Sequence, residues 1–297
     1  MWAATVLLCS WSSVAAFAPQ HAARRAPASA LAASSPGAEL DRRSLLVGLG
    51  GGGVSVAGGW PVFAADGKTV VVAGATGQTG KRVMERLTAR ADVTAIGGVR
   101  DVAKGSKALE GKTVRRLDVV EDGIEQLKTS LAGADAVVCC TGFVPGNPFQ
   151  MAKVAHAVDN LGTKSLVAAA QAAGVKKFVL VSSILTNGRA WGQANSPGFQ
   201  ITNAFGGVLD EKIEAERALR ASGLDFTIVR PGGLKATPPT GELIVAKEDT
   251  LNAGEVSRDL VADVCVAALF DSKSTNKVVE IIEGDGSPKL PESKWFA

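Results

Sequence analysis

The chain has 297 residues, of which 32 are basic and 29 acidic, giving a formal net charge of +3. This near-balance argues against a surface for nucleic acid or anionic membranes, because such a surface needs a strong excess of basic side chains. Two histidines and four cysteines, with no CxxC pair, supply too few ligands for a zinc cluster or a disulfide framework. A hydrolytic triad that contains histidine is equally short of candidates.

The first 65 residues differ in composition from the rest of the chain. Residues 1–16 form a short apolar run ending in small side chains, as a signal peptide does. Residues 17–40 are rich in Ala, Ser and Arg and nearly free of acid, which is typical of a transit peptide. The AAFAP junction resembles the bipartite presequences of algae with complex plastids, so we expect import into a plastid. A secretory signal followed by a linker is the alternative.

Residues 41–65 pair two arginines with a mildly apolar, glycine-rich run that ends in small side chains. This segment resembles a twin-arginine signal, which inside a plastid would direct the protein to the thylakoid lumen. Its glycines add little apolar surface and make it a poor membrane anchor. A soluble nicotinamide pool is expected in the stroma, however, so both stroma and lumen stay open.

The remaining residues, 66–297, are enough for one sizeable domain, and we expect no transmembrane anchor in it. Short β-branched runs alternate there with amphipathic stretches. This alternation predicts a single-domain α/β Rossmann fold, a doubly wound parallel sheet with helices on both faces. The predicted strands are 69–74, 92–99, 113–119, 135–142, 177–183, 225–232 and 277–283, and the predicted helices include 80–91, 123–133, 206–219 and 256–272.

One long connection, residues 184–207, leads from the fifth predicted strand to the helix that carries Lys212. Connections of this length in a compact domain usually have a function or lack order. Its aromatic side chains Trp191, Phe199 and Phe205 suggest a cover for a substrate or a partner. The alternative is that these aromatics only pin the loop to the body of the domain.

The first predicted strand is followed by the glycine-rich turn GATGQTG. Gly74, Gly77 and Gly80 let the chain turn tightly and bring backbone N–H groups and the positive end of a helix against a pyrophosphate. An apolar strand before the turn and an amphipathic helix after it support a dinucleotide site. The candidate residues of this turn are Gly74, Thr76, Gly77, Gln78, Thr79 and Gly80.

The end of the second predicted strand indicates which dinucleotide is bound, because an NAD site has an acid there and an NADP site a cation. Arg100 comes first and Lys104 follows one turn later, and we assign both to the 2′-phosphate of NADP(H). Asp101 is the competing residue and would favour NAD. The sequence therefore favours NADP(H) as the cofactor.

Ligands of such folds lie at the carboxyl ends of the strands. The same rule predicts contacts for the rest of the dinucleotide. The RPGG turn after the sixth predicted strand combines a fixed proline φ with glycines that permit close approach. The residues expected at these ends are Asp118 and Val119 beside the adenine, Thr141 and Gly142 on the route to the nicotinamide, and Pro231 and Gly232 beside the nicotinamide.

Several motifs, in this order, carry a resemblance to a known family. They are GATGQTG, VRD, LDV, VDNLGTKSLVAAAQAAGVKKFVLVSS, LDEKIEAERALRASGLDFTIVRPGGL and VSRDLVADVCVAAL. Together they resemble the atypical short-chain dehydrogenase/reductase superfamily, above all its NAD(P)H-binding branch of plants, algae and cyanobacteria, which includes the domain of the Tic62 plastid translocon protein. The resemblance spans residues 69 to about 283 and implies a Rossmann fold that binds NAD(P)H. That branch mixes reductases, isomerases and redox sensors, so the activity stays open.

The resemblance also implies positions for catalysis, since conventional members use Ser, Tyr and Lys. Ser182 or Ser183 would be the serine, and Lys212 the lysine that also holds the nicotinamide ribose. The tyrosine position falls on Val208, and the chain has no tyrosine. Carbonyl reduction by that triad is therefore excluded. The alternatives are capping for the serines and a solvated helix charge for Lys212; His156 is expected to be a packing histidine.

Three functions remain open. Hydride can pass to an acceptor that takes its proton from water, such as a flavin or a quinone, which requires only that two rings be positioned. Another group can protonate a carbonyl compound. Alternatively, the protein binds NADP(H) without catalysis, as a redox sensor or an assembly factor for a plastid membrane complex. An NADPH-dependent oxidoreductase is the leading interpretation. The candidate proton donors are Thr141, Asp159 (where extended members have a helper asparagine), Ser182, Ser183 and Lys212.

Overall fold

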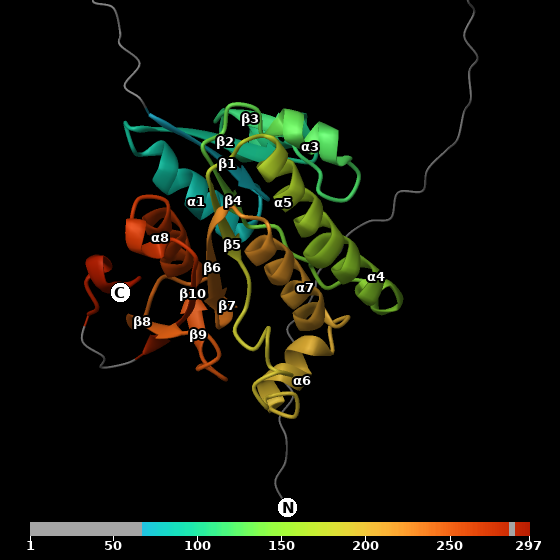
Figure 1. The fold of residues 1–297 in the computed structure, drawn as a ribbon, viewed down its shortest axis with the longest axis vertical. Coiled ribbons are helices and arrows are strands. Elements are labelled where there is room, and N and C mark those ends of the chain that lie inside the picture. Colours follow the sequence, from blue (N-terminus) through green and yellow to red (C-terminus); the bar gives the residue numbers. More distant parts are fainter. Residues whose placement is uncertain (1–66, 285–288) are drawn as a thin grey trace, which may run out of the picture. The chain divides into compact units, whose positions relative to one another are not determined.

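The main sheet is built from the buried β-branched runs of the sequence. The computed structural model describes residues 67–284 and 289–297, and within them this sheet has eight strands in the order β3-β2-β1-β4-β5-β6-β10-β8 (Figure 1). Every neighbouring pair is parallel except β10 and β8, which pair antiparallel at one edge. The predicted leader segments 1–16, 17–40 and 41–65 lie outside the described residues.

All seven predicted strands are present, and two of them are only about half as long as expected. The strands predicted at 113–119 and 135–142 leave the sheet early, because the residues after β3 and β4 diverge to form the walls of a cleft. The seven strands are β1 (Lys68–Ala73), β2 (Val93–Val99), β3 (Val114–Arg116), β4 (Ala136–Cys139), β5 (Lys177–Val181), β6 (Asp225–Pro231) and β10 (Lys277–Gly284).

Three short strands are additions that the sequence pattern does not predict. The edge strand β8 (Glu242–Lys247) is only partly buried, so it lacks the continuous apolar character of the central strands. Strands β7 (Gly233–Lys235) and β9 (Glu255–Ser257) pair with each other in a separate two-stranded sheet. With three residues each, they are too short to give a periodic signal.

The helices cover both faces of the sheet, as the doubly wound fold requires (Figure 1). Among the described residues, no helix is long and apolar enough to cross a membrane. The helices are α1 (Gln78–Thr88), α2 (Val102–Ala108), α3 (Ile124–Ser130), α4 (Met151–Ala155), the π-helical segment η2 (His156–Gly162), α5 (Thr163–Ala172), α6 (Pro197–Asn203), α7 (Val208–Ala221) and α8 (Arg258–Ala268).

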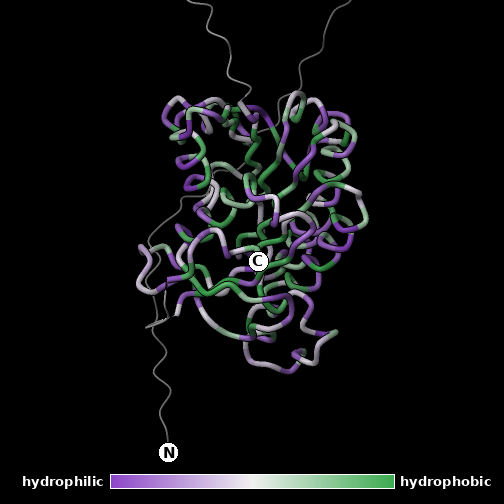
Figure 2. The backbone as a smooth tube through the Cα atoms, turned by 60° about the vertical axis from the view of Figure 1, so that its left-hand side comes forward, coloured by the Kyte–Doolittle hydropathy of each residue, from purple (hydrophilic) through white to green (hydrophobic). Residues whose placement is uncertain are grey.

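Two apolar cores lie on opposite faces of the sheet, and alternate residues of β1 enter each of them. Val70 and Val72 pack in the core that α1 and α8 cover, whereas Val71 and Ala73 pack in the core that α3, α5 and α7 cover. Figure 2 shows the hydrophobic stretches gathered in the interior of the fold, with hydrophilic stretches mostly around them. Burial on both faces confirms the predicted single-domain Rossmann architecture.

The long connection 184–207 folds against the body of the domain. It contains α6, whose first turn is capped by Ser196 and begins with Pro197, two ordinary signals for the start of a helix. Phe199 is buried in a third apolar cluster beside Ile184 and Val208, and Trp191 packs against that cluster. Two of the three aromatics therefore pin the connection to the domain, while Phe205 stays exposed.

Candidate functional site

A cleft of about 370 Å³ opens at the carboxyl ends of the first four strands of the sheet. It lies where the chain leaves β1 and β4, the point at which the order of strands reverses, and ligands of doubly wound folds bind at such points. A larger cavity of about 660 Å³ lies at the opposite ends of the strands and has no glycine-rich turn. The predicted cofactor residues that line the cleft are Gly74, Thr76, Gly77, Arg100, Asp118, Val119, Thr141 and Gly142.

The glycine-rich turn brings the first helix close to the first strand. Gly74 has a φ of +75°, and a Cβ atom on it would lie 3.0 Å from the backbone of Cys140. A Cβ atom on Gly80 would lie 2.2 Å from the Gly74 carbonyl oxygen, so only glycine permits this packing of α1. Gly77 precedes α1 in extended conformation. The first turn of α1 is thereby aimed at the cleft, as a pyrophosphate site requires.

Two of the predicted turn residues point elsewhere. Thr79 is buried under the turn, and Gln78 accepts hydrogen bonds from Arg82 through its side-chain oxygen at 3.3 Å and its carbonyl oxygen at 2.9 Å. Neither side chain lines the cleft. In this structure, these two residues can serve a pyrophosphate only through the backbone of the first helical turn.

At the end of β2, the cationic and acidic candidates for the ribose end of the cofactor have different surroundings. The Asp101 carboxylate accepts a hydrogen bond from the Lys104 backbone N–H at 3.0 Å and so caps α2, and this contact lowers the pKa of Asp101. The Lys104 ammonium lies 3.6 Å from Asp101, and its side chain is 88% exposed outside the cleft. Arg100 lines the cleft, and in the part of the chain that the structure describes no carboxylate lies within ion-pair distance of its guanidinium.

Asp118 and Val119, which follow β3 in the chain, form part of the cleft wall. Asp118 is buried, and its carboxylate accepts hydrogen bonds from the backbone N–H groups of Val120 at 3.0 Å and Glu121 at 3.3 Å. Its own N–H donates to the carboxylate of Asp122 at 2.8 Å. The Asp118 side chain is thus used to shape the turn, and Val119 presents apolar surface to the cleft.

A buried ion pair lies beyond the end of β4. The Lys212 ammonium on α7 is 2.8 Å from Oδ1 of Asp159 on η2, and the Lys212 side chain is only 18% exposed. Oδ2 of Asp159 accepts a hydrogen bond from the Phe143 backbone N–H at 3.0 Å, which ties the pair to the chain that follows β4. Lys212 and Asp159 share a small cavity with Thr141. Lys212 is therefore not a solvated helix charge.

The ion pair fixes the protonation state of Lys212. Burial alone would lower the pKa of the ammonium, but the charge of Asp159, 2.8 Å away, outweighs burial and holds the pKa above its ordinary value. At neutral pH the side chain is a cation. A lysine in this state can donate hydrogen bonds to ribose hydroxyls but is a weak acid for protonating a substrate.

The structure distinguishes the two candidate serines. The Ser182 hydroxyl is buried and donates a 2.6 Å hydrogen bond to Oε1 of Glu216 on α7. Ser183 is partly exposed; its carbonyl oxygen accepts a hydrogen bond from the Thr186 hydroxyl at 2.6 Å. Among the described residues, the Ser183 hydroxyl has no hydrogen-bond partner. Ser183 is the one of the two whose side chain is available to a ligand.

Val208 begins α7, one turn before Lys212. Gly206 and Gly207 precede it with φ values of +77° and +71°, a left-handed pair that bends the chain into the helix. The Val208 side chain is buried in the third apolar cluster. The position thus presents only apolar surface, one helical turn from the ammonium of Lys212.

Pro231 and Gly232 are buried and lie outside the walls of the cleft. The Gly232 N–H donates to the Ile281 carbonyl at 2.9 Å, and a Cβ atom on Gly232 would lie 2.5 Å from the Gly254 carbonyl oxygen. Glycine is therefore required at position 232 because the backbone of Gly254 lies so close to it.

Sequence reasoning missed several cleft residues on the segment after β4 and on the helix that follows it. Val154 and Val158, four residues apart, put apolar side chains on one wall, a spacing that a helical pattern could have shown. Phe143 and Val144 form another part of the wall. His156 is half exposed, with Nδ1 2.9 Å from Oε2 of Glu211, so it does not pack in the core.

Comparison with known proteins agrees with this geometry. The chain matches a family model described as NAD(P)H-binding over residues 74–272. It is 46% identical over 237 residues to an uncharacterised chloroplastic protein of Arabidopsis thaliana, a match that covers 77% of this chain and 82% of the relative. Protein TIC 62, chloroplastic, of Pisum sativum is 34% identical over 250 residues, which cover 77% of this chain but only 45% of that protein. These chloroplastic relatives support a plastid location.

Two further matches concern enzymes. Sanguinarine reductase of Eschscholzia californica is 28% identical over 249 residues, covering 72% of this chain and 88% of that protein. A solved structure from Bacillus halodurans, described as an NAD-dependent epimerase/dehydratase, has a TM-score of 0.65 and 26% identity, covering 77% of this chain and 98% of the other. The relatives of this chain therefore include oxidoreductase-like and epimerase-like proteins.

Proposed function

We propose, from the premise that this chain belongs to the NAD(P)H-binding branch of the atypical short-chain dehydrogenase/reductase superfamily, that it is an NADPH-dependent oxidoreductase with an unconventional site. The pyrophosphate of NADP(H) would lie against the first turn of α1, whose packing depends on Gly74 and Gly80. The adenosine end would lie between the ends of β2 and β3, and the nicotinamide would lie toward Lys212. The residues present fit a dinucleotide.

The preference for NADP(H) is carried by one observation, the contrast between Arg100 and Asp101. The Asp101 carboxylate caps α2 and so is not free to take the ribose hydroxyls, as an acid in an NAD site would. Arg100 instead lines the cleft, and in the described part of the chain no carboxylate lies within ion-pair distance of its guanidinium. A planar guanidinium in this position suits a phosphate, with Lys104 adding a more distant positive charge.

The chemistry of the nicotinamide end favours an acceptor that needs no proton from the protein. Lys212 is held as a cation by Asp159, and Val208 offers only apolar surface. Burial raises the pKa of the nearby Cys139 thiol, which removes it as an acid at neutral pH. Lys212 and Ser183 would position the ribose and the acceptor. A flavin or a quinone, which can take its proton from water, therefore suits the site better than a carbonyl compound.

The experiment that tests this function is a titration of the purified protein with NADPH and NADH, followed by nicotinamide fluorescence. We expect a clear preference for NADPH, and then NADPH oxidation with a flavin or a quinone as acceptor. The name of sanguinarine reductase, a relative over most of its length, supports a search for reductase activity. Equal affinity for the two dinucleotides would contradict the NADP(H) assignment, and binding without oxidation of NADPH by any acceptor would contradict the enzymatic one.

The second candidate is a non-catalytic NADP(H)-binding redox sensor or assembly factor for a plastid membrane complex. Similarity to TIC 62 favours it, as does the exposed apolar surface beside the cleft, where Val144 is 79% and Phe149 98% exposed. Exposed side chains of this kind often mark contacts with other proteins. NADPH-dependent association with a thylakoid or envelope complex, without turnover, would support this candidate over the first.

We further propose, from the composition of the leader segments, the compartment in which the protein acts. Residues 1–16 and 17–40 would take the protein into the plastid of an alga with complex plastids, and 41–65 resemble a thylakoid signal. A soluble NADPH pool favours the stroma. Fractionation of plastids with an antibody to the domain would decide between stroma and lumen.

A further inference from the structure

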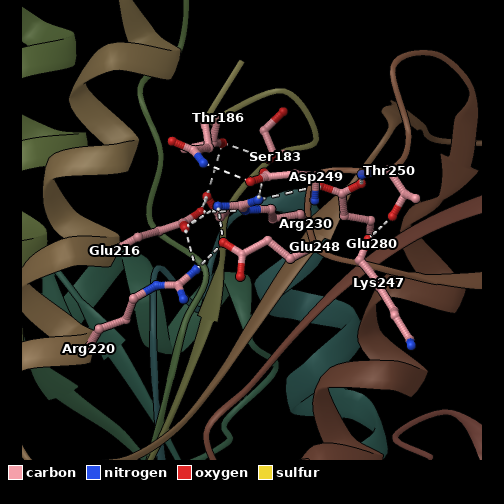
Figure 3. A network of polar contacts seen from close by, with 12 residues as sticks. Ser183, Thr186, Glu216, Arg220, Arg230, Lys247, Glu248, Asp249, Thr250 and Glu280 are labelled. Carbon is pink, nitrogen blue, oxygen red and sulfur yellow. Dashed lines mark hydrogen bonds and ion pairs between the residues drawn. The ribbon is translucent and has the colours of Figure 1, made fainter. Parts of the chain in front are cut away.

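A fully buried arginine lies at the end of β6, one residue before Pro231. The Arg230 guanidinium contacts four carboxylates: its Nη2 lies 2.7 Å from Glu216 and 3.2 Å from Glu248, and its Nη1 lies 2.8 Å from Asp249 and 3.4 Å from Glu280. Nε also donates to Glu216 at 3.0 Å, so Glu216 is bound at two nitrogens. Figure 3 shows these side chains converging on Arg230. We call this group the Arg230 cluster.

The partners of Arg230 come from three further parts of the fold. Glu216 lies on α7, Glu280 on β10, and Glu248 and Asp249 in the turn after β8. Glu280 also accepts hydrogen bonds from three backbone N–H groups of that turn, at 3.0, 3.0 and 2.7 Å. Asp249, with a φ of +59°, is thereby held in a conformation that residues other than glycine rarely adopt. The turn after β8 is thus built around Glu280 and Arg230.

The cluster reaches the segments that carry the nicotinamide end of the proposed site. Glu216 accepts the hydrogen bond of Ser182, the residue before Ser183. Glu216 also follows Lys212 by four residues, one turn along the same side of α7. Asn187, in the long connection, donates to Asp249 at 2.7 Å. One group of ion pairs and hydrogen bonds therefore joins the end of β5, the end of β6, α7 and the long connection.

Stability alone does not account for such a cluster. It contains four carboxylates but, in the described part of the chain, only two guanidinium groups, those of Arg230 and Arg220. Taking unbalanced charges out of water is costly, and apolar side chains of similar size often stabilise a core as well or better. A buried guanidinium does provide fixed geometry, because its planar fork donates hydrogen bonds to carboxylates only in set directions.

We propose that Arg230 is a positioning residue, which sets the nicotinamide end of the site by holding the ends of β5 and β6 in register with α7. This inference rests on the proposed function, since that function assigns Ser183 and Lys212 to the nicotinamide and the acceptor. Arg230 itself does not line the cleft and acts through Glu216 and Ser182. The adenosine end, formed by β1 to β3, is independent of it.

The test compares the parent protein with two variants that weaken the cluster to different degrees. Arg230→Lys keeps the charge but loses the fork, and Ser182→Ala removes one hydrogen bond and so has little risk of preventing folding. Asp225→Asn is the matched control, because the Lys177–Asp225 ion pair of 2.9 Å joins the same two strands, β5 and β6, at their other ends. Each protein is studied by amide hydrogen exchange without ligand, and by NADPH titration with nicotinamide fluorescence.

In the ligand-free variants we expect faster exchange at three places together: residues 182–187, the first two turns of α7, and residues 247–252. The increase should be about tenfold for Arg230→Lys and about threefold for Ser182→Ala, with residues 74–80 unchanged. The dissociation constant of NADPH should change by less than about threefold, because the adenosine end is intact, while the emission of the bound nicotinamide moves toward that of free NADPH. The control should speed exchange only at the amino ends of β5 and β6.

Two results would overturn the proposal. One is faster exchange confined to the strand that carries the substitution; the other is parental nicotinamide emission in both variants. If Arg230→Lys does not fold, Ser182→Ala decides by the same criteria. A parent protein that binds no NADPH would refute the proposed cofactor, and the exchange pattern would then decide by itself whether the cluster couples the three segments.

Discussion

Arg100 is the residue on which the choice of cofactor depends, because it lines the cleft without a carboxylate partner in the described part of the chain. We expect Arg100→Ala to weaken NADPH binding by about 10- to 100-fold, the loss of one charge-assisted contact to a phosphate, and to leave NADH binding nearly unchanged. Fluorescence titration with both dinucleotides measures this.

Lys104→Ala is the control for that experiment. The side chain is 88% exposed and lies 3.6 Å from Asp101, so its removal should cost NADPH affinity less than about threefold. Equal losses of NADPH and NADH affinity in Arg100→Ala would contradict the assignment of Arg100 to the 2′-phosphate.

Asp159 is the residue that makes a buried cation at position 212 tolerable. Asp159→Asn would leave the Lys212 ammonium buried without a counter-charge, and we expect a loss of about 3–5 kcal/mol in the free energy of unfolding at pH 7. Denaturant unfolding measures this. The double variant with Lys212→Met should recover part of the loss, since no unpaired charge is then buried; no recovery would show that the pair is not coupled.

The Lys212 ammonium also makes protein stability depend on pH. Because the folded-state pKa of Lys212 is raised above its ordinary value, its contribution to stability is fully present below about pH 10 and is lost as the pH rises through the folded-state pKa. Protein stability should therefore show no change from this group between about pH 6 and pH 9.

At the scale of elements, the approach of α1 to β1 decides whether the cofactor can bind. A Cβ atom on Gly80 would meet the Gly74 carbonyl oxygen at 2.2 Å, so Gly80→Ala has to displace the helix from the turn. We expect a loss of about 2 kcal/mol or more in stability and a loss of NADPH binding. Gly123→Ala, at the start of α3 with open space around its Cβ position, should cost less than about 1 kcal/mol and leave binding intact. Thermal unfolding and titration compare the two.

The start of α7 is a second element whose packing can be tested. Val208 is buried beside Ile184 and Phe199, so Val208→Tyr should lower stability by about 1–3 kcal/mol through overpacking. NADPH affinity should stay within about threefold, because the Val208 side chain does not line the cleft. Val208→Phe, of similar size but without the hydroxyl, is the control in thermal unfolding and titration. A large loss of affinity in both would mean that the cofactor extends over the start of α7.

At the scale of the whole molecule, binding of the dinucleotide should stabilise the domain against unfolding. At a free NADPH concentration of 100 times the dissociation constant, the gain is about 2.7 kcal/mol, which for a domain of this size raises the midpoint of thermal unfolding by about 5–10 °C. NADH at the same concentration should give a smaller shift. A scan of thermal unfolding with each dinucleotide checks this, and equal shifts would argue against NADP(H) as the preferred cofactor.

The sequence alone determines the class of fold and indicates the proposed place of the cofactor, because both depend on local patterns. Runs such as residues 70–73, apolar at every position, rich in β-branched valine and followed by a glycine-rich turn, indicate a strand buried on both faces. The turn from Gly74 to Gly80 joins such a strand to an amphipathic helix, and glycine at position 80 is required by a contact inside the turn, with the Gly74 carbonyl oxygen. Arg100 and Asp101 are likewise placed by the end of their own strand.

Only the tertiary structure decides the roles of single polar side chains, since their partners lie far along the chain. Ser182 and Ser183 cannot be distinguished in sequence, and only the hydrogen bond from Ser182 to Glu216, 34 residues away, gives them different roles. For Lys212 the sequence favours a contact with the ribose but leaves a solvated helix charge open, until Asp159 is placed 2.8 Å from it. Arg230 reads as part of a turn beside the nicotinamide, yet its four carboxylates come from α7, β10 and the turn after β8. The energy of a charge depends on burial and distance, and no local pattern encodes either.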